Sequence, residues 1–85
     1  MKVVLSPRAN KNLKKLPSLL KKKFLKQLDY LTKNPLHPSL RARKMSGLDV
    51  YEARIDYHYR FVYQTSREKI EIIALGPHDE GLGKK

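Results

Sequence analysis

The sequence contains no cysteine, no tryptophan and no apolar run long enough to cross a bilayer. Without cysteine the chain forms neither a disulfide nor a thiolate metal site, so packing alone must stabilise the fold. This composition is typical of a reducing compartment, and we expect the protein in the cytoplasm. The apolar start, residues 1–5, is too short for a signal peptide, so neither secretion nor membrane association is expected.

Several signatures of catalytic and metal sites are also missing. There is no glycine-rich phosphate loop and no Gly-x-Ser-x-Gly turn, which argues against nucleotide hydrolysis and ordinary acyl transfer. The three histidines, His37, His58 and His78, are scattered and never show the His-x-x-x-His spacing of a metal-binding helix. We therefore expect no metal and no cofactor.

Acidic residues are nearly absent from the first half of the chain. Residues 1–46 contain thirteen lysines and arginines against one acid, whereas residues 47–85 contain six against seven, and the net charge of the whole chain is +11. A field of this strength attracts phosphate backbones or acidic protein surfaces. We expect a polyanionic partner, and an acidic protein bound to the basic half would stabilise the chain as well as regulate it.

The hydrophobic pattern of the first half predicts one strand and two helices. Residues 2–5 form the expected strand, and Ser6–Pro7 is suited to begin a helix, because serine caps an orphan N–H and proline needs no donor there. Pro17 separates the two helices and Asn34–Pro35 ends the second. The apolar positions at helical spacing are Ala9, Leu13 and Leu16, then Leu20, Phe24, Leu28 and Leu31.

The second half predicts three strands after a polar loop at residues 35–46. Alternating apolar and polar side chains mark strands at residues 50–55, 59–65 and 69–75, joined by short turns as an antiparallel meander. The expected fold is therefore α+β: one domain over residues 1–85, with an N-terminal strand, a helical hairpin and the meander. The four strands would form one sheet with both helices on one face.

Side-chain alternation places a charged cluster on the uncovered face of this sheet. If the apolar faces meet the helices, then Glu52, Arg54 and Arg60 share the opposite face. An arginine in the middle of a strand is energetically costly unless its guanidinium binds a phosphate, a carboxylate or water. The two arginines therefore suggest an anion-binding site. The structural alternative is that Glu52 neutralises Arg54 within the sheet, which makes Arg60 the stronger functional candidate.

His78 follows the last expected strand, at an end of the sheet from which a loop reaches the exposed face. An ordinary histidine pKa near ~6.5 suits proton transfer at neutral pH. The alternative is a solvated loop side chain without function. His37, in the proline-punctuated loop, and His58, in a turn, are weaker candidates.

Lysines crowd the outer surface of the predicted helices. The usual explanation is a solvated helix face, and the alternatives are contact with ribosomal RNA or with an acidic peptide. The lysines in question are Lys11, Lys14, Lys15, Lys21, Lys22, Lys23 and Lys26.

Three motifs in the second half resemble the RelE/ParE superfamily of toxin–antitoxin toxins. Residues 45–48 are similar to its Leu-x-Gly motif, with Met45 in the first place. Residues 51–55 resemble Tyr-x-x-Arg-Ile, and residues 59–63 resemble Tyr-Arg-x-x-Tyr. The resemblance covers nearly the whole chain, and it implies a toxin with the strand, helix and meander order described above.

The resemblance also implies roles for individual residues. RelE-like members are ribosome-dependent endoribonucleases of mRNA, in which strand arginines contact the scissile phosphate, and Arg54 and Arg60 match those positions. His78 matches a C-terminal residue that assists proton transfer, with Glu52 or Lys44 as its helper. The expected RNA-binding residues are Lys44, Arg41, Arg43, Lys22 and Lys26.

One departure from the pattern and two alternative functions accompany this resemblance. Asp79, Glu80 and Gly81 follow His78, where family members often have an aromatic residue. The ParE branch has the same fold and inhibits DNA gyrase without being a nuclease, and a degenerate toxin would keep only RNA or antitoxin binding. In each case the resemblance implies an acidic antitoxin as partner.

Overall fold

The computed structural model describes residues 2–45 and 49–77 of the chain. Its elements follow one another in the order strand, two helices, short 3₁₀-helix and four strands. They are β1 (Lys2–Leu5), α1 (Pro7–Lys15), α2 (Ser18–Lys33), η1 (Pro38–Leu40), β2 (Arg43–Lys44), β3 (Val50–Arg54), β4 (Tyr59–Thr65) and β5 (Lys69–Pro77).

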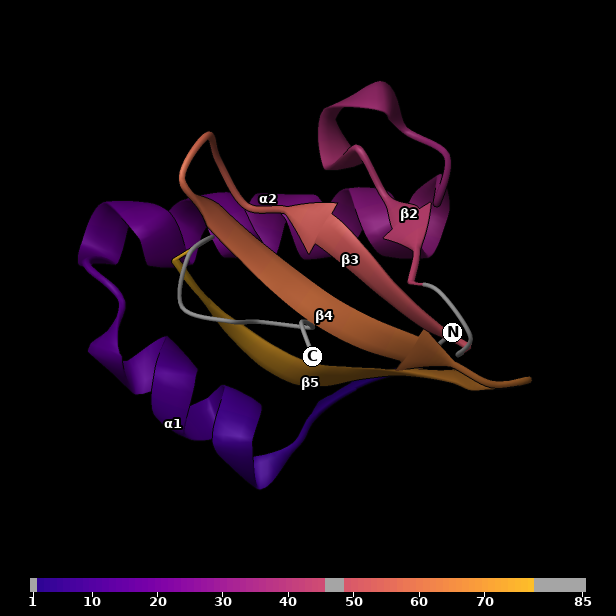
Figure 1. Cartoon of the computed structure of the whole chain (residues 1–85), viewed down its shortest axis with the longest axis horizontal. Helices are drawn as coiled ribbons and strands as arrows, with labels where there is room; N and C mark the ends of the chain where they lie inside the picture. Colours follow the sequence, from indigo (N-terminus) through magenta and orange to yellow (C-terminus); the bar gives the residue numbers. More distant parts are fainter. Residues whose placement is uncertain (1, 46–48, 78–85) are drawn as a thin grey trace.

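The strands form one twisted sheet in the order β1-β5-β4-β3-β2 (Figure 1). β1 is parallel to β5, and the remaining neighbours are antiparallel, so β3, β4 and β5 form the expected meander. A parallel pair needs a long connection. Here the connection between β1 and β5 contains the α1–α2 hairpin, η1 and the strands β2, β3 and β4. The predicted α+β fold is confirmed.

Ser6 fixes the start of α1 and ties it to the sheet. Its hydroxyl accepts a hydrogen bond from the Ala9 amide at 3.0 Å and donates one to the Ile73 carbonyl at 2.7 Å. Pro7 occupies the first turn of the helix, where its missing donor costs nothing. One side chain therefore caps the helix and anchors it to β5.

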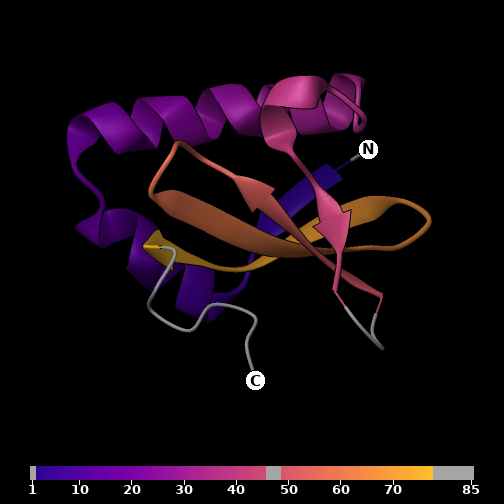
Figure 2. The same ribbon diagram turned by 45° about the horizontal axis from the view of Figure 1, so that its top comes forward.

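Both helices pack on the same face of the sheet. Phe24 of α2 and Phe61 of β4, both fully buried, meet edge to face with ring centroids 5.3 Å apart. In Figure 2, α2 lies along one side of the sheet. The buried residues of this core are Ala9, Leu16, Leu20, Phe24, Leu31, Leu40, Ala53, Ile55, Phe61, Tyr63, Ile70, Ile72 and Leu75.

The opposite face of the sheet has only a small apolar cluster around Val62 and Ala74. Adjacent residues of a strand point to opposite faces, so Arg60 and Val62 lie on this second face while Phe61 and Tyr63 enter the core. The register shifts between Val62 and Tyr63, because Val62 pairs with Ala74 and Tyr63 with Ile72. In the described part of the chain, neither helix contributes to this cluster.

The loop predicted at residues 35–46 contains structure that the sequence did not indicate. Pro38–Leu40 forms a 3₁₀-helix, and Arg43–Lys44 forms a fifth strand by pairing with Glu52 and Tyr51. The loop prediction is wrong there, because two polar residues show no apolar alternation and their pairing is decided by the neighbouring strand. No helix in the described residues is long and apolar enough to cross a membrane.

Candidate functional site

Arg54 and Arg60 are direct partners in the ladder between β3 and β4. Opposite residues of an antiparallel pair project from the same face, about 4.5–5.5 Å apart at Cβ. Arg60 in turn pairs with Gly76 of β5, which has no side chain to fill the neighbouring space. The sheet therefore places the two arginines, here called the arginine pair, side by side on the face opposite the main core.

Glu52 lies two residues before Arg54 on the same face, but its partner is Arg43. Both Nε and Nη2 of Arg43 donate to Oε1 of Glu52, at 3.3 and 3.2 Å. Glu52 is buried, whereas the side chain of Arg43 is 74% exposed. The alternative in which Glu52 neutralises Arg54 is wrong, because β2 supplies a closer cation.

Arg54 has no carboxylate partner among the described residues. Its Nε is buried and has no hydrogen-bond acceptor, and its guanidinium carbon lies 6.0 Å from the centre of the Tyr57 ring. A buried donor without an acceptor is costly and rare in folded proteins. One donor of the Arg54 guanidinium, Nε, is therefore without an acceptor among the described residues.

A pocket of about 580 Å³ opens beside Arg54, between α2, η1 and the turn after β3. Its cationic lining residues are Lys23, Lys26, Arg41 and Arg54. Lys26 and Arg41, predicted to bind RNA, thus come together with Arg54, although 28 positions separate Lys26 from Arg54 in the sequence. We call this cavity the basic pocket.

The remaining predicted RNA-binding residues lie apart from the basic pocket. Lys22 is exposed on α2, and Lys44 forms an ion pair with Asp49, Nζ to Oδ1 3.4 Å. Arg43 is the exposed partner of Glu52. These three residues are accessible, but they do not form one site with Lys26 and Arg41.

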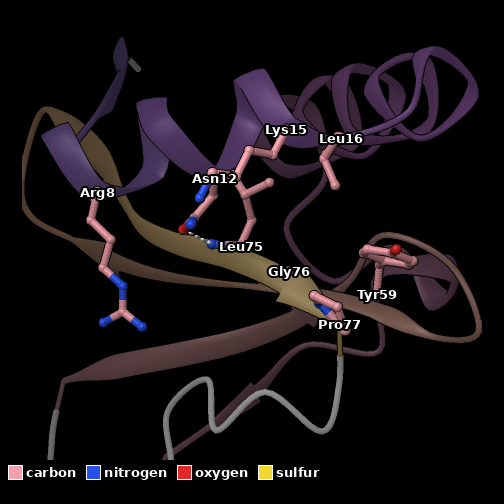
Figure 3. A pocket seen from close by; sticks show the side chains of 8 residues that line it. All are labelled: Arg8, Asn12, Lys15, Leu16, Tyr59, Leu75, Gly76 and Pro77. Carbon is pink, nitrogen blue, oxygen red and sulfur yellow. Dashed lines mark hydrogen bonds between the residues drawn. The ribbon is translucent and has the colours of Figure 1, made fainter.

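His78 lies outside the described residues, directly after the last residue of β5. Near that end of β5, a second pocket of about 280 Å³ is lined by α1, Tyr59 and residues 75–77 (Figure 3). Asn12 closes one side of it, because its Oδ1 accepts the Leu75 amide at 3.1 Å. Gly76 lines this pocket and also pairs with Arg60, but the pocket lies on the α1 side of the sheet, whereas the arginine pair projects from the opposite face.

The other two histidines are placed as the sequence suggested. His37 stacks on Tyr30 with ring centroids 3.7 Å apart, and its Nδ1 accepts the amide of Ser39 at 3.1 Å. His58 is exposed beside Tyr57. Among the described residues, no three histidine, aspartate or glutamate side chains are grouped so that they could hold a metal ion.

Sequence reasoning missed Tyr57 and Gln27. Tyr57 is a 74% exposed aromatic residue that lines the basic pocket, and an aromatic residue in a polar turn was the available signal. Gln27 is a buried polar residue whose amide donates to the carbonyls of Arg54 at 2.7 Å and Ser39 at 3.0 Å. Its position on the apolar side of α2 was the available signal for a structural role.

The family comparison agrees with this architecture. The family described as ParE toxin of type II toxin-antitoxin system, parDE, matches residues 3–82. The chain belongs to this family, and it is a toxin of the RelE/ParE superfamily. No curated protein is significantly similar to the chain in sequence.

Solved structures show the same fold over almost the whole chain. A chain of the archaeal RelE–RelB complex from Pyrococcus horikoshii is 27% identical, with a TM-score of 0.78, covering 93% of this chain and 96% of that one. The YoeB dimer from Staphylococcus aureus is 25% identical, with a TM-score of 0.80, covering 92% and 97%. A chain of the intact E. coli RelBE toxin–antitoxin complex is 25% identical, with a TM-score of 0.75, covering 93% and 98%.

Proposed function

We propose that this toxin is a ribosome-dependent endoribonuclease that cleaves mRNA. The observation that carries the proposal is the arginine pair, two cations placed opposite each other on a sheet face that the helices leave open. The similarity to RelE and YoeB structures supports the choice of RNA as substrate, through the resemblance to RelE-like nucleases. The proposal places the protein in the cytoplasm, where its substrate is.

The proposed reaction is attack of a ribose 2′-hydroxyl on its neighbouring phosphate. The 2′-oxygen forms a bond to phosphorus, the bond from phosphorus to the 5′-oxygen breaks, and the products are a 2′,3′-cyclic phosphate and a 5′-hydroxyl. Negative charge develops on the phosphoryl oxygens in the transition state. Arg54 and Arg60 would stabilise that charge, and removing one such donor typically lowers the rate about 10²- to 10³-fold.

Two protons must move in this reaction. His78 would act as general acid or base, because an imidazole exchanges protons near neutral pH. Glu52 is the candidate helper, since it shares the face of Arg54 and only its Oε1 is bonded to Arg43 among the described residues. Lys44, the other candidate helper, pairs with Tyr51 and so projects from the face of the main core, away from the arginine pair, which leaves Glu52 as the better placed of the two.

The protein partner in this proposal is an acidic antitoxin. The related toxins are found in a RelE–RelB complex, a YoeB–YefM complex and a RelBE complex. The net charge of +11 gives this chain a strong attraction for an acidic polypeptide. An antitoxin covering the basic surface would block the approach of mRNA and the ribosome.

Primer extension on cellular mRNA tests the proposal. Inducing the wild-type toxin should produce cuts within codons of translated messages, and Arg60→Ala should remove them. Arg67→Ala, which removes an exposed arginine from the turn between β4 and β5, is the matched control and should cut normally. Intact mRNA in cells whose growth the wild-type toxin arrests would overturn the nuclease proposal.

Gyrase inhibition is the second candidate, because the matching family is named for the ParE toxin. It predicts stalled replication with intact mRNA, and His78→Ala should then leave growth inhibition unchanged. Under the nuclease proposal the same variant should lose toxicity. A degenerate toxin that binds only RNA or antitoxin predicts no growth inhibition at all.

A further inference from the structure

Four of the side chains that line the basic pocket are cationic, and packing of the fold does not require positive charge there. Lys23 and Lys26 come from α2, Arg41 follows η1, and Arg54 ends β3. Asp56 is the one carboxylate among the lining residues, and it lies 3.7 Å from the ammonium group of Lys23. Four cations against one acid in a single cavity repel one another until an anion enters.

Arg54, which lines this pocket, has a donor without an acceptor among the described residues, and its guanidinium lies beside Tyr57, another lining residue. Its Nε is buried without a hydrogen-bond partner, and among the described residues no carboxylate pairs with its guanidinium. A phosphate oxygen is the acceptor that suits an arginine fork, because planar N–H groups and phosphate oxygens match in geometry. An incoming phosphate would meet the terminal amino groups of this fork and neutralise the neighbouring cations.

The walls of the pocket are built before any ligand arrives. The buried amide of Gln27 joins three elements by donating to the carbonyls of Ser39 and Arg54. Asp56 shapes the turn after β3, because its Oδ1 accepts the amides of His58 at 2.9 Å and Tyr59 at 3.0 Å. Arg41 adopts a left-handed conformation, φ 46°, directly after η1. A preformed cavity loses little entropy when it binds a ligand.

Aromatic residues in the same cavity point to a nucleotide rather than to a bare anion. Tyr57 is 74% exposed and lies beside the guanidinium of Arg54, with 6.0 Å from the ring centre to Cζ. Tyr30 also lines the pocket, and the ammonium group of Lys26 lies 6.0 Å from its ring centre. Cations interleaved with accessible rings are the usual surface for single-stranded RNA, where phosphates meet cations and bases stack on rings.

We propose that the basic pocket is a second RNA-binding site, in which Lys26, Arg41 and Arg54 hold a backbone phosphate of single-stranded RNA and Tyr57 stacks on an adjacent base. Arg54 lines this pocket and is also the ladder partner of Arg60, at the end of β3 beyond its short pairing with β2. The RNA strand would therefore run from the arginine pair around this edge of the sheet to α2. The site rests on the proposed nuclease function and extends it by naming the path of the RNA beyond the cut.

The test is direct binding of a fluorescein-labelled ten-nucleotide oligouridylate to purified protein at two salt concentrations. The double variant Lys26→Ala/Arg41→Ala should bind at least about tenfold more weakly, and its salt slope should fall by roughly 0.7 for each phosphate that the protein no longer neutralises. Lys11→Ala/Lys14→Ala removes the same charge from α1 and should change affinity much less. Equal weakening in the two double variants would overturn the site, because it would indicate only a diffuse positive field.

Substitutions of Tyr57 distinguish a site that binds nucleotides from a site that binds an acidic protein. Tyr57→Ala should weaken oligouridylate binding about 5- to 150-fold, as loss of one stacked base does, while Tyr57→Phe should bind normally. Polyglutamate of equal charge should bind more weakly and respond to neither substitution. The inference is wrong if Tyr57→Ala binds RNA like the wild type, or if polyglutamate binds the pocket as tightly as RNA.

These outcomes are distinct from failure of the nuclease proposal. Wild-type protein that leaves cellular mRNA intact, yet binds oligouridylate with the variant order given above, would refute the nuclease and keep the pocket. Cleavage that depends on Arg60 would support the nuclease proposal. If RNA binding then did not change on substitution of Tyr57, Lys26 or Arg41, the pocket would be refuted.

Discussion

Arg54 and Arg60 stand directly opposite each other in the β3–β4 ladder. Like charges in opposed positions of an antiparallel pair are destabilising, by an amount on the order of 0.2–1 kcal/mol. Arg54 adds the cost of a buried Nε without an acceptor. An arrangement that costs stability in the free protein and matches an anionic ligand is typical of a functional site.

Arg54→Met should therefore abolish function without loss of stability. Methionine keeps an unbranched apolar stem and removes both the orphaned donor and the opposed charge, so the free energy of unfolding should stay within about 1 kcal/mol of the wild type or rise. Urea denaturation measures the stability, and primer extension measures the loss of cuts. A variant destabilised by clearly more than this would mean that Arg54 is held for structural reasons.

Gln27→Leu should destabilise the fold by about 1–3 kcal/mol, because the buried Gln27 amide is lost and two partly buried main-chain carbonyls lose their donor. The affected carbonyls belong to Ser39 and Arg54, so η1 and the end of β3 should loosen first. Hydrogen exchange of the amides in these segments checks the location. Gln64→Leu, at an exposed position of β4, is the control and should change stability by less than about 0.5 kcal/mol.

Ser6→Ala should cost about 1–2 kcal/mol of stability, since one hydroxyl caps α1 and also donates to the carbonyl of Ile73. Thermal unfolding followed by circular dichroism measures the change. Ser18→Ala, at the exposed start of α2, should have little effect. Equal effects of the two substitutions would show that the hydrogen bond between Ser6 and β5 contributes nothing.

Burial raises the pKa of Tyr63 to about 12, and the neighbouring phenol of Tyr51 adds to the effect. The folded state thus keeps a proton that the unfolded state releases above pH 10, so this stabilisation is complete below pH 10 and is lost between pH 10 and 12. A pKa difference of about two between the folded and unfolded states corresponds to at most about 3 kcal/mol. Denaturation across this pH range measures the loss.

Tyr63→Phe should remove this part of the alkaline loss of stability, because phenylalanine has no proton to release. Tyr57→Phe, which alters an exposed ring, should keep it. Identical pH profiles for the wild type and Tyr63→Phe would show that Tyr63 does not govern the transition. The comparison also cancels the effect of lysine deprotonation, because all three proteins have the same lysines.

The sequence was sufficient for the parts of the fold that follow strict periodicity. Alternation alone placed Arg54 and Arg60 on one face, because the period of a strand is two and Phe61 and Ala53 had to enter the core. The helical stripe of α2 was equally clear, with Phe24 and Leu31 buried as expected. Sequence periodicity predicts which face a residue lies on when that face is set by one helix or strand packing on one core.

The features that the sequence did not reveal depend on contacts between elements. The partner of Glu52 could not be foreseen, because Arg43 lies in a two-residue strand with no pattern of its own. The basic pocket combines α2, η1 and β3, and no spacing in the sequence brings Lys26, Arg41 and Arg54 together. His78 lies outside the described residues, so its role stays a prediction.

The central claim is that the arginine pair promotes cleavage of RNA, and the most direct measurement is cutting of a defined mRNA bound to purified ribosomes by purified toxin. The wild type and Arg67→Ala should cut at the same rate, while Arg60→Ala, shown by circular dichroism to be folded, should cut about 10²- to 10³-fold more slowly. Cleavage by Arg60→Ala at the wild-type rate would contradict the account.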